Sequence, residues 1–133
     1  MVDQVIVLVE DDEDTREFME LFLTDVGYHV HMWPSRHGAL ALIRNAQPHI
    51  VIMDLQMDEP TDGWQLLEEL RADPATVSIP AILYSADEHF LRSRREALDL
   101  LRCEFLIKPF ALDQLLDRIQ GLVDGPPADP PTP

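Results

Sequence analysis

Apolar runs and helix-patterned stretches alternate five times along this chain, and this alternation constrains the fold more than any other feature of the sequence. The first run, residues 4–9, is continuous and rich in Val, as expected of a strand that is buried on both faces. Five repeats of strand and helix predict an α/β fold in which helices cover both faces of a parallel sheet. We expect strands at 4–9, 28–33, 49–53, 80–84 and 103–107, and helices at 14–25, 35–46, 63–72, 88–101 and 111–123.

Two residues are expected to mark helix ends. Gly27 follows the first helical stretch, and glycine commonly occupies the left-handed position just after a helix C-terminus. Ser35 precedes the second stretch, where its hydroxyl can cap the free N–H groups of a helix that runs to Ala46. Both signals place helix boundaries beside the expected second strand.

Length and composition indicate one folded domain. The 133 residues are enough for one hydrophobic core, and 46% of them are hydrophobic and 26% charged. Residues 124–133 hold five of the eleven prolines, so we expect a disordered Pro-rich tail after a domain that spans 3–123. Cys103 is the only cysteine, which excludes an internal disulfide and favours a small core residue.

The charge balance bears on partners and location. The formal net charge is −15 at pH 7, which argues against direct nucleic-acid binding because phosphate backbones require a basic surface. No apolar run approaches the roughly 20 residues that cross a bilayer, and the first residues show no signal-peptide pattern. We therefore expect no membrane association and a cytoplasmic location.

Polar side chains follow four of the five expected strands. The acids of residues 10–14 follow the first strand, Asp54 the third, Ser85 the fourth and Lys108 the fifth. Open α/β sheets place their functional sites at the carboxyl ends of the strands. These side chains are therefore expected to converge at one edge of the sheet.

The acids after the first strand divide into two groups. Residues 12–14 stand at a helix start, where carboxylates cap free N–H groups and suit the helix dipole. That explanation does not extend to Glu10, Asp11 or Asp54. Two carboxylates about 4 Å apart repel by about 4 kcal/mol at an effective dielectric of about 20, so such a cluster should either bind a cation or have raised pKa values. Few oxygen ligands with room for water favour Mg²⁺ over Ca²⁺.

Lys108 is the only lysine of the sequence, since the other nine basic residues are arginine. It could serve only to neutralise the acids, but an arginine would do that equally well. A lysine ammonium is a compact charge that suits one oxygen or one phosphoryl group. A carboxylate, a bound Mg²⁺, the hydroxyl of Ser85 and this ammonium at one place predict a phosphoryl-transfer site whose nucleophile is the carboxylate.

Four short motifs carry a resemblance to a known family. They are VIVLVEDD, IVIMDL, AILYSA and FLIKPF, at the ends of the first, third, fourth and fifth expected strands. Together they resemble the receiver domain of two-component response regulators, the CheY-like superfamily, over nearly the whole folded chain. The resemblance implies a doubly wound five-stranded parallel sheet of order 2-1-3-4-5 flanked by five helices. It also implies a phosphorylation-dependent signalling switch, and not an enzyme.

Residue by residue, the resemblance implies a complete phosphorylation site. Asp54 would be the phosphoacceptor, which takes a phosphoryl group from a histidine kinase or a small acyl phosphate. Glu10, Asp11, Asp54 and the backbone carbonyl of Gln56 would bind Mg²⁺ or Mn²⁺, with Glu10 acting through water. Lys108 would pair with Asp54 and then with the phosphoryl group, and the peptide bond after Lys108 would be cis.

The resemblance also implies how a switch of this kind would work. Ser85 would hydrogen-bond the phosphoryl group, and Phe105 would turn between exposed and buried positions. The face of the fourth helix, fifth strand and fifth helix would then change its affinity for a downstream protein, and the same face could pair two copies in a homodimer. Gln56 and Asp87 would tune the lifetime of the phosphoryl group.

Two other classes of protein stay open beside the switch. A phosphatase of the haloacid dehalogenase type also uses Asp and Mg²⁺ at a strand end, but it needs a second Asp where this chain has Gln56. A receiver-like module without phosphorylation would not need the acceptor, acid pair, hydroxyl and lysine. We expect a stand-alone receiver, because no further domain fits after residue 123. Its partners would be a sensor histidine kinase or phosphotransfer protein and a downstream protein effector.

The sequence departs from the family pattern in three places. The loop after Asp54 reads DLQMDEPTDGW, with Asp58 where proline is usual and one extra residue before Asp62. The segment before the fifth strand lacks the glycine that often ends the fourth helix, and Ala111 replaces the usual Ser or Asp cap of the last helix. These departures leave open the shape of the loop and of the output face.

Overall fold

The structure is a computed structural model, and it describes residues 4–123. Five strands form one parallel sheet of order β2-β1-β3-β4-β5, as predicted. The strands are β1 (Val5–Val9), β2 (His29–Trp33), β3 (Ile50–Asp54), β4 (Ala81–Ser85) and β5 (Cys103–Ile107). The predicted Pro-rich tail, 124–133, lies outside the described residues.

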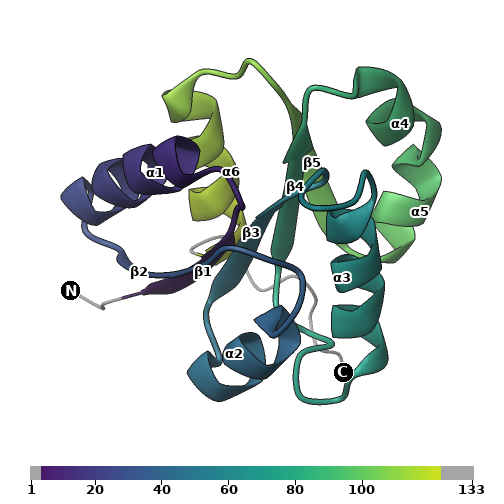
Figure 1. Ribbon diagram of the computed structural model, residues 1–133, viewed down its shortest axis with the longest axis horizontal. Helices are drawn as coiled ribbons and strands as arrows, with labels where there is room; N and C mark the ends of the chain where they lie inside the picture. The colour runs from purple at the N-terminus through teal and green to yellow at the C-terminus, as the bar shows by residue number, and fades with distance from the viewer. Residues whose placement is uncertain (1–3, 124–133) are drawn as a thin grey trace.

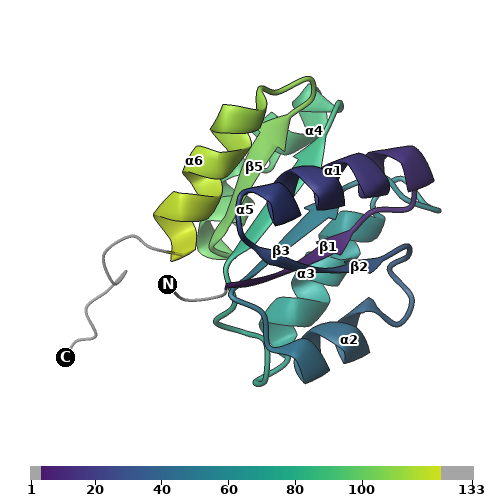
Figure 2. The same cartoon turned by 90° about the vertical axis from the view of Figure 1, so that its left-hand side faces the viewer.

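Helices cover both faces of this sheet. They are α1 (Glu13–Asp25), α2 (Ala39–Ala46), α3 (Asp62–Ala72), α4 (Glu88–Ser93), α5 (Arg95–Leu100) and α6 (Leu112–Val123). Figures 1 and 2 show α1 and α6 on one face, and α2, α3, α4 and α5 on the other. This is the doubly wound arrangement that was predicted. Among residues 4–123, no helix is long and apolar enough to cross a membrane.

Strand alternation divides the core into two layers. Val7 and Met53 belong to the layer under α2 to α5, while Leu8 and Ile52 belong to the layer under α1 and α6. Because β3 and β4 are buried on both faces, they read in the sequence as continuous apolar runs. Cys103 lies in the first layer, where burial raises the pKa of its thiol to about 12, in keeping with the predicted core role.

Gly27 ends α1 as predicted. Its backbone has φ +110°, a conformation that favours glycine because glycine has no Cβ. The N–H of Gly27 donates to the carbonyl of Thr24 at 3.0 Å, and the N–H of Tyr28 donates to the carbonyl of Leu23 at 3.1 Å. These two bonds satisfy carbonyls at the helix end and turn the chain toward β2.

The predicted role of Ser35 as a helix cap is wrong. Its hydroxyl accepts the N–H of His37 at 3.0 Å within a turn, and α2 begins only at Ala39. Gly38 precedes the helix with φ +84°, and a Cβ there would lie 2.9 Å from the ring of Trp33. Both the backbone conformation and the close ring favour glycine before α2, so the helix starts without a hydroxyl cap.

The single helix expected at 88–101 is divided into α4 and α5. α4 ends at Ser93, whose hydroxyl donates to the carbonyl of Phe90 at 2.8 Å. The guanidinium of Arg94, at the break, lies 4.6 Å from the ring centroid of Phe90 and 5.2 Å from that of Trp64 in α3. The break therefore coincides with a contact between α3 and α4, which helical periodicity does not encode.

Gly63 allows α3 to start directly against the end of β3. A Cβ at this position would overlap the carbonyl oxygen of Asp54 and would lie 2.8 Å from the Cα of Leu55. Gly63 also donates its N–H to the carbonyl of Leu55 at 2.8 Å. The helix start and the strand end are therefore closer than a larger side chain would permit.

We expect Gly63→Ala to lower the free energy of unfolding by about 1–3 kcal/mol, because the added methyl group forces the strand end and the helix apart. Gly121→Ala is the matched control, since nothing lies within 4 Å of a Cβ built there in α6. That substitution should stabilise the helix by about 0.5–1 kcal/mol. Urea unfolding of both variants and the parent measures the two changes, and equal effects would contradict the close approach at Gly63.

Candidate functional site

One row at the carboxyl edge of the sheet contains three residues that are distant in the sequence: Glu10, Asp54 and Tyr84. Asp54 is the register partner of Tyr84, and Val9 pairs with Met53, so Glu10 follows β1 beside Asp54. Alternate residues of a strand point the same way, and Tyr84 packs in the layer under α1 and α6. The row therefore runs across β1, β3 and β4 on the face that these two helices cover.

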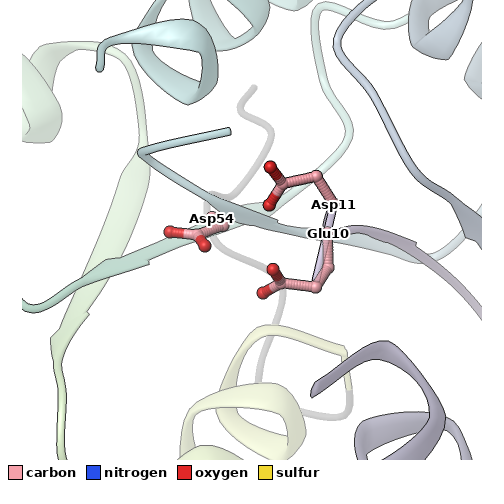
Figure 3. Close-up of side chains that lie close together, drawn as sticks. All are labelled: Glu10, Asp11 and Asp54. Atoms are coloured by element: carbon pink, nitrogen blue, oxygen red, sulfur yellow. The ribbon is translucent and has the colours of Figure 1, made fainter. Parts of the chain in front are cut away.

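Three carboxylates gather at this edge. Glu10, Asp11 and Asp54 each offer an oxygen, and these oxygens all lie within 4.8 Å of one another. Figure 3 shows the carboxylates of Glu10 and Asp11 on either side of the strand end, both turned toward Asp54. Glu10 and Asp54 are buried and Asp11 is exposed, so solvent reaches the cluster on the Asp11 side.

The start of α1 fixes the backbone of the acid pair. Asp12 caps this helix, because its Oδ2 accepts the N–H of Thr15 at 2.9 Å and the hydroxyl of Thr15 at 2.7 Å. The guanidinium of Arg16 donates to the carbonyl oxygen of Glu10 at 2.9 Å and to that of Asp11 at 3.4 Å. The acid that caps the helix and the acids that join the cluster are different residues, as predicted.

Both carboxylate oxygens of Glu10 have hydrogen-bond partners. Oε2 accepts the N–H of Asp12 at 3.0 Å, and Oε1 accepts the hydroxyl of Tyr84. Burial, and next the charge of Glu10, hold the pKa of the Tyr84 hydroxyl well above its ordinary value of 10, so the hydroxyl remains a donor. Glu10 is thus bound from two sides.

Asp54 is the acid on which the surrounding charges act. Burial, followed by the charge of Glu10, raises the pKa of Asp54 to about 7 from an ordinary value of 3.8. Lys108 opposes this rise, with its Nζ 3.7 Å from Oδ2 of Asp54. The N–H of Gln56 opposes it too, because it donates to Oδ1 at 3.2 Å. The carboxyl group of Asp54 therefore changes between its protonated and ionised forms near neutral pH.

Lys108 reaches the cluster from the end of β5. Its N–H donates to the carbonyl of Ser85 at 2.9 Å, and the peptide bond to Pro109 is cis, as the resemblance implies. Its ammonium lies 4.8 Å from the ring centroid of Tyr84 as well as near Asp54. The Lys108 side chain is 36% exposed, so it meets both solvent and the carboxylates.

Ser85 and Asp87 connect the cluster to α4. Ser85 is buried, and its Oγ accepts the N–H of Asp87 at 2.9 Å. Asp87 caps α4, since its carboxylate accepts the N–H of Phe90 at 3.0 Å. The side chain of Gln56 is exposed, and the roles of Gln56 and Asp87 in phosphoryl lifetime stay predictions.

Phe105 lies apart from the carboxylates. It is half-buried in β5 and packs against the core layer under α2 to α5, with the guanidinium of Arg95 6.0 Å from its ring centroid. A groove of about 660 Å³ runs along α4, α5, β5 and α6, and its lining includes Phe105, Arg95 and Arg118. Phe105 is therefore on the surface expected to contact partners, and its switching role stays a prediction.

The long loop after Asp54 closes on a buried acid. Asp62, at the start of α3, is buried and accepts the N–H of Glu59 at 2.9 Å. Arg36, from the loop after β2, donates to Asp62 at 3.1 Å and to Glu69 at 3.1 Å. The loop, which is expected to be one residue longer than the family pattern, thus ends in a turn whose acid, Asp62, is ion-paired with Arg36.

The carboxylate cluster fits a small divalent cation. Mg²⁺ binds oxygen at about 2.1 Å, so oxygens on opposite sides of the ion lie about 4.2 Å apart. The oxygens of Glu10, Asp11 and Asp54 lie within 4.8 Å of one another, a spacing that a small side-chain shift or a bridging water closes. An all-oxygen donor set with one exposed member suits an ion that keeps part of its water shell.

Two features of the site escape sequence reasoning. Tyr84 reads there as one more apolar member of a strand motif, although its register with Asp54 places it in the site. Counting back one residue from the polar end of β4 would have found it, because rows of a parallel sheet join equivalent positions. The pair of Arg36 and Asp62 joins the loop after β2 to the start of α3, and no local pattern signals it.

The sequence matches the family model of the response regulator receiver domain over residues 6–120. Response regulator RR06 of Streptococcus pneumoniae is 33% identical over 120 residues, which cover 88% of this chain and 52% of that protein. Response regulator MprA of a Mycobacterium strain is 32% identical over 118 residues, which cover 89% of this chain and 50% of that protein. The chain spans about half the length of these curated relatives.

Two solved structures are similar over nearly the whole chain. The non-phosphorylated HemR receiver domain from Leptospira biflexa has a TM-score of 0.80 at 25% identity, with 98% of this chain and 100% of that chain covered. The receiver domain of the sensor histidine kinase PA1611 from Pseudomonas aeruginosa, which has a magnesium ion coordinated in its active-site cleft, has a TM-score of 0.78 at 25% identity. That match covers 92% of this chain and 99% of that chain.

We expect Arg36→Met to lower the free energy of unfolding by about 2–4 kcal/mol, because it leaves the buried carboxylate of Asp62 without its ion pair. Arg44→Met is the matched control: Arg44 pairs with Asp73 at 3.2 Å, but 56% of its side chain is exposed. Loss of an exposed pair should cost at most about 1 kcal/mol. Urea unfolding measures both, and equal losses would contradict the special role of the Arg36 pair.

The raised pKa of Asp54 predicts a pH-dependent stability. Because this pKa is 3.8 in an ordinary environment and about 7 in the folded chain, the folded state keeps a proton that the unfolded state releases between these values. The stabilising contribution of this group is complete below pH 3.8 and is lost as the pH rises through 7.

We therefore expect Asp54→Asn to raise the free energy of unfolding by about 1–3 kcal/mol at pH 8 and by less at pH 5. The reason is that the variant never buries a charge at this position. Urea unfolding at the two pH values, without divalent cations, measures the difference. Asp58→Asn, at an exposed loop acid, serves as the control. If Asp54→Asn raised the free energy of unfolding equally at both pH values, the raised pKa of Asp54 would be contradicted.

Proposed function

The chain belongs to the response regulator receiver domain family, and we propose that it is a phosphorylation switch whose acceptor is Asp54. Receiver domains are the phosphorylation-dependent switching modules of two-component response regulators, and they interact with histidine kinases or phosphotransfer proteins. We propose the acceptor, the metal, the partners and the surfaces that would contact those partners from contacts within this chain.

One observation carries the proposal: Asp54 lies between acids on one side and an ammonium on the other. Oxygens of Glu10, Asp11 and Asp54 lie within 4.8 Å of one another, and Nζ of Lys108 is 3.7 Å from Oδ2 of Asp54. A core has no need of such a group of charges, because burial of each charge is unfavourable. Binding a cation and a phosphoryl group would use all four side chains.

Asp54 is the proposed nucleophile. An oxygen of its ionised carboxylate bonds to the phosphorus of a phosphohistidine or small acyl phosphate, while the bond from phosphorus to the leaving nitrogen or oxygen breaks and the leaving group keeps the electron pair. The product is an aspartyl phosphate. Lys108, beside Oδ2, would pair with the incoming phosphoryl oxygens, and the hydroxyl of Ser85 would donate to one of them.

Glu10, Asp11 and Asp54 would hold Mg²⁺, or Mn²⁺ in its place, with the backbone carbonyl of Gln56 as a further ligand. When bound, the ion neutralises negative charge on the acids and on the phosphoryl oxygens. The magnesium ion coordinated in the active-site cleft of the PA1611 receiver domain supports this assignment. These residues of this chain supply the oxygen ligands. Asp11 is exposed to solvent, so an ion can reach the cluster from its side.

Switching would start at Ser85. A hydroxyl drawn toward the phosphoryl group would leave the N–H of Asp87, which caps α4, and so shift the start of that helix. The groove along α4, α5, β5 and α6 contains Phe105, whose change of position would alter the surface offered to a downstream protein effector. The mixed charges of this face, which include Arg118 paired with Glu104 at 3.4 Å, would also suit a homodimer.

A second groove lies next to the acceptor and fits the phosphoryl donor. It has a volume of about 590 Å³, lies between α1 and the segment after β5, and includes Phe18, Phe110 and Lys108 in its lining. Phe18 is 55% exposed, an apolar side chain well placed to contact a protein partner. We propose that a sensor histidine kinase or phosphotransfer protein docks here and presents its phosphohistidine to Asp54.

Several expectations stay predictions. These are a cytoplasmic location, the absence of direct nucleic-acid binding, and action as a switch without turnover of a substrate. The stand-alone nature of the chain also stays a prediction, because its matched relatives are about twice as long. Their activities and partners belong to whole proteins and not to the segment that matches.

The proposed acceptor is tested by labelling with acetyl phosphate in the presence of Mg²⁺. We expect the parent to take up close to one phosphoryl group per chain and Asp54→Asn to take up almost none, because the nucleophilic carboxylate is lost. Intact-protein mass spectrometry measures the label. Asp58→Asn is the matched control, since it makes the same change at an exposed acid of the adjacent loop and should label like the parent.

Equal labelling of the parent and Asp54→Asn would rule out Asp54 as the acceptor. Labelling of the parent that is unaffected by a chelator would rule out the proposed metal. Continuous release of phosphate over many turnovers from simple phosphate esters would instead favour the phosphatase class.

A further inference from the structure

We propose that Tyr84 is a positioning residue of this site, which holds the carboxylate of Glu10 with its hydroxyl and the ammonium of Lys108 with its ring. The inference rests on the proposed function, since it assigns a role within the same phosphoryl-transfer site. Tyr84 acts through these two side chains and not on the phosphoryl group itself.

The hydroxyl of Tyr84 fixes one carboxylate oxygen of Glu10. It donates to Oε1, while the N–H of Asp12 donates to Oε2 at 3.0 Å. With a donor on each oxygen, the buried carboxylate cannot rotate without losing a hydrogen bond. Figure 3 shows that the carboxylate held in this way is turned toward Asp54. The direction of the remaining lone pairs of Glu10 is therefore set from outside the cluster.

This hydrogen bond spans the strand that carries the acceptor. Glu10 follows β1 and Tyr84 belongs to β4, with β3 between them. Neighbouring strands lie about 4.8 Å apart, so the two side chains together bridge about 10 Å. Asp54, the register partner of Tyr84, lies between the ends of this bridge. The bridge ties together the two strands that flank the acceptor.

The ring of Tyr84 holds the ammonium of Lys108. Nζ is 4.8 Å from the ring centroid, within the range of about 6 Å for cation–π attraction. The ring itself is fixed, because Tyr84 is 1% exposed and Phe110 packs against it edge-on at 5.9 Å between ring centroids. Lys108 thus has a fixed attractive surface on one side and Asp54 on the other, 3.7 Å away.

A role in the core alone does not explain a tyrosine at this position. Its neighbours in the same layer, Ile82 and Leu106, are aliphatic and bring no polar atom that must be satisfied. A buried hydroxyl needs a hydrogen-bond partner, and that of Tyr84 is a carboxylate of the site and not a backbone carbonyl. The hydroxyl therefore serves Glu10, in addition to the packing that the ring provides.

Tyr84→Phe tests the hydroxyl, because the ring and its packing remain. We expect the Mg²⁺ dissociation constant, measured by calorimetry, to rise about ten-fold, as is typical when an outer partner of a metal ligand is lost. The rate of labelling by acetyl phosphate at saturating Mg²⁺ should stay within about two-fold of the parent, because the hydroxyl acts on a metal ligand and saturating Mg²⁺ compensates for weaker binding of the ion. Tyr28→Phe removes the other tyrosine hydroxyl of the chain, which precedes β2 at the amino ends of the strands, and should change neither quantity.

Two further variants separate the hydroxyl from the ring. In a Glu10→Gln background, Tyr84→Phe should leave the Mg²⁺ affinity unchanged, because the hydroxyl acts through that carboxylate and the two effects are not additive. Tyr84→Leu also removes the ring, and it should slow labelling at saturating Mg²⁺ by about two- to five-fold, the strength of a partly exposed cation–π contact. A ring that serves only packing would leave this saturated rate unchanged.

NMR of the unmodified protein, with ¹³C at the Cζ atoms of its tyrosines, gives a reading that needs no variant of Tyr84. Adding Mg²⁺ should shift the Tyr84 resonance, because the ion changes the charge on the carboxylate that its hydroxyl contacts. The Tyr28 resonance, assigned with Tyr28→Phe, should stay in place.

An unchanged Mg²⁺ affinity in Tyr84→Phe, or a Tyr84 resonance that does not respond to Mg²⁺, overturns the positioning role and leaves the proposed function intact. If the parent binds no Mg²⁺, or if Asp54→Asn labels as strongly as the parent, the proposed function fails and the positioning role fails with it. The two failures are therefore distinguishable.

Discussion

The burial of the Asp54 carboxylate beside other acids is the constraint on which the rest of this site depends. Loss of solvent and the charge of Glu10 both favour its protonated form, and the ammonium of Lys108 opposes them. The balance leaves the pKa of Asp54 about 7, so the group is neither a permanent anion nor a permanently protonated acid. The neighbouring contacts fix the charged groups that set this pKa. Arg16 and Asp12 fix the acids after β1, and Tyr84 contacts two of the charged side chains that act on Asp54, those of Glu10 and Lys108.

The backbone around Asp54 is held as firmly as its side chain. Gly63 brings the start of α3 into contact with the end of β3, where a Cβ would overlap the carbonyl of Asp54. The loop between them is closed by Asp62, which accepts the N–H of Glu59, and Arg36 donates to Asp62 from the loop after β2. A loop of this length next to Asp54 is thus compatible with the site, because Gly63 lets α3 start directly against the end of β3.

The sequence predicts what local pattern and strand order determine. Alternating runs specify a parallel sheet, and once the strands are parallel their ends must bring Glu10, Asp11, Asp54 and Lys108 together. Local patterns do not predict contacts between helices and strands that are distant in the sequence. The break between α4 and α5 occurs in a segment with no Gly or Pro, where Arg94 meets Trp64 of another helix. The hydroxyl of Tyr84 is hidden within an apolar motif for the same reason, since its partner is two strands away.

Lys108 has a consequence for chemistry done on this molecule. Because the other nine basic side chains of the 133 residues are arginine, its ε-amine is the one lysine amine in the sequence. The side chain of Lys108 is 36% exposed, and its Nζ lies 3.7 Å from Oδ2 of Asp54. A reagent selective for lysine amines is thereby directed to the site itself, without any engineered handle. A fluorophore, a crosslinker or an isotopic tag attached in this way would sit next to Asp54, and its rate of attachment would report how tightly the ammonium is held there.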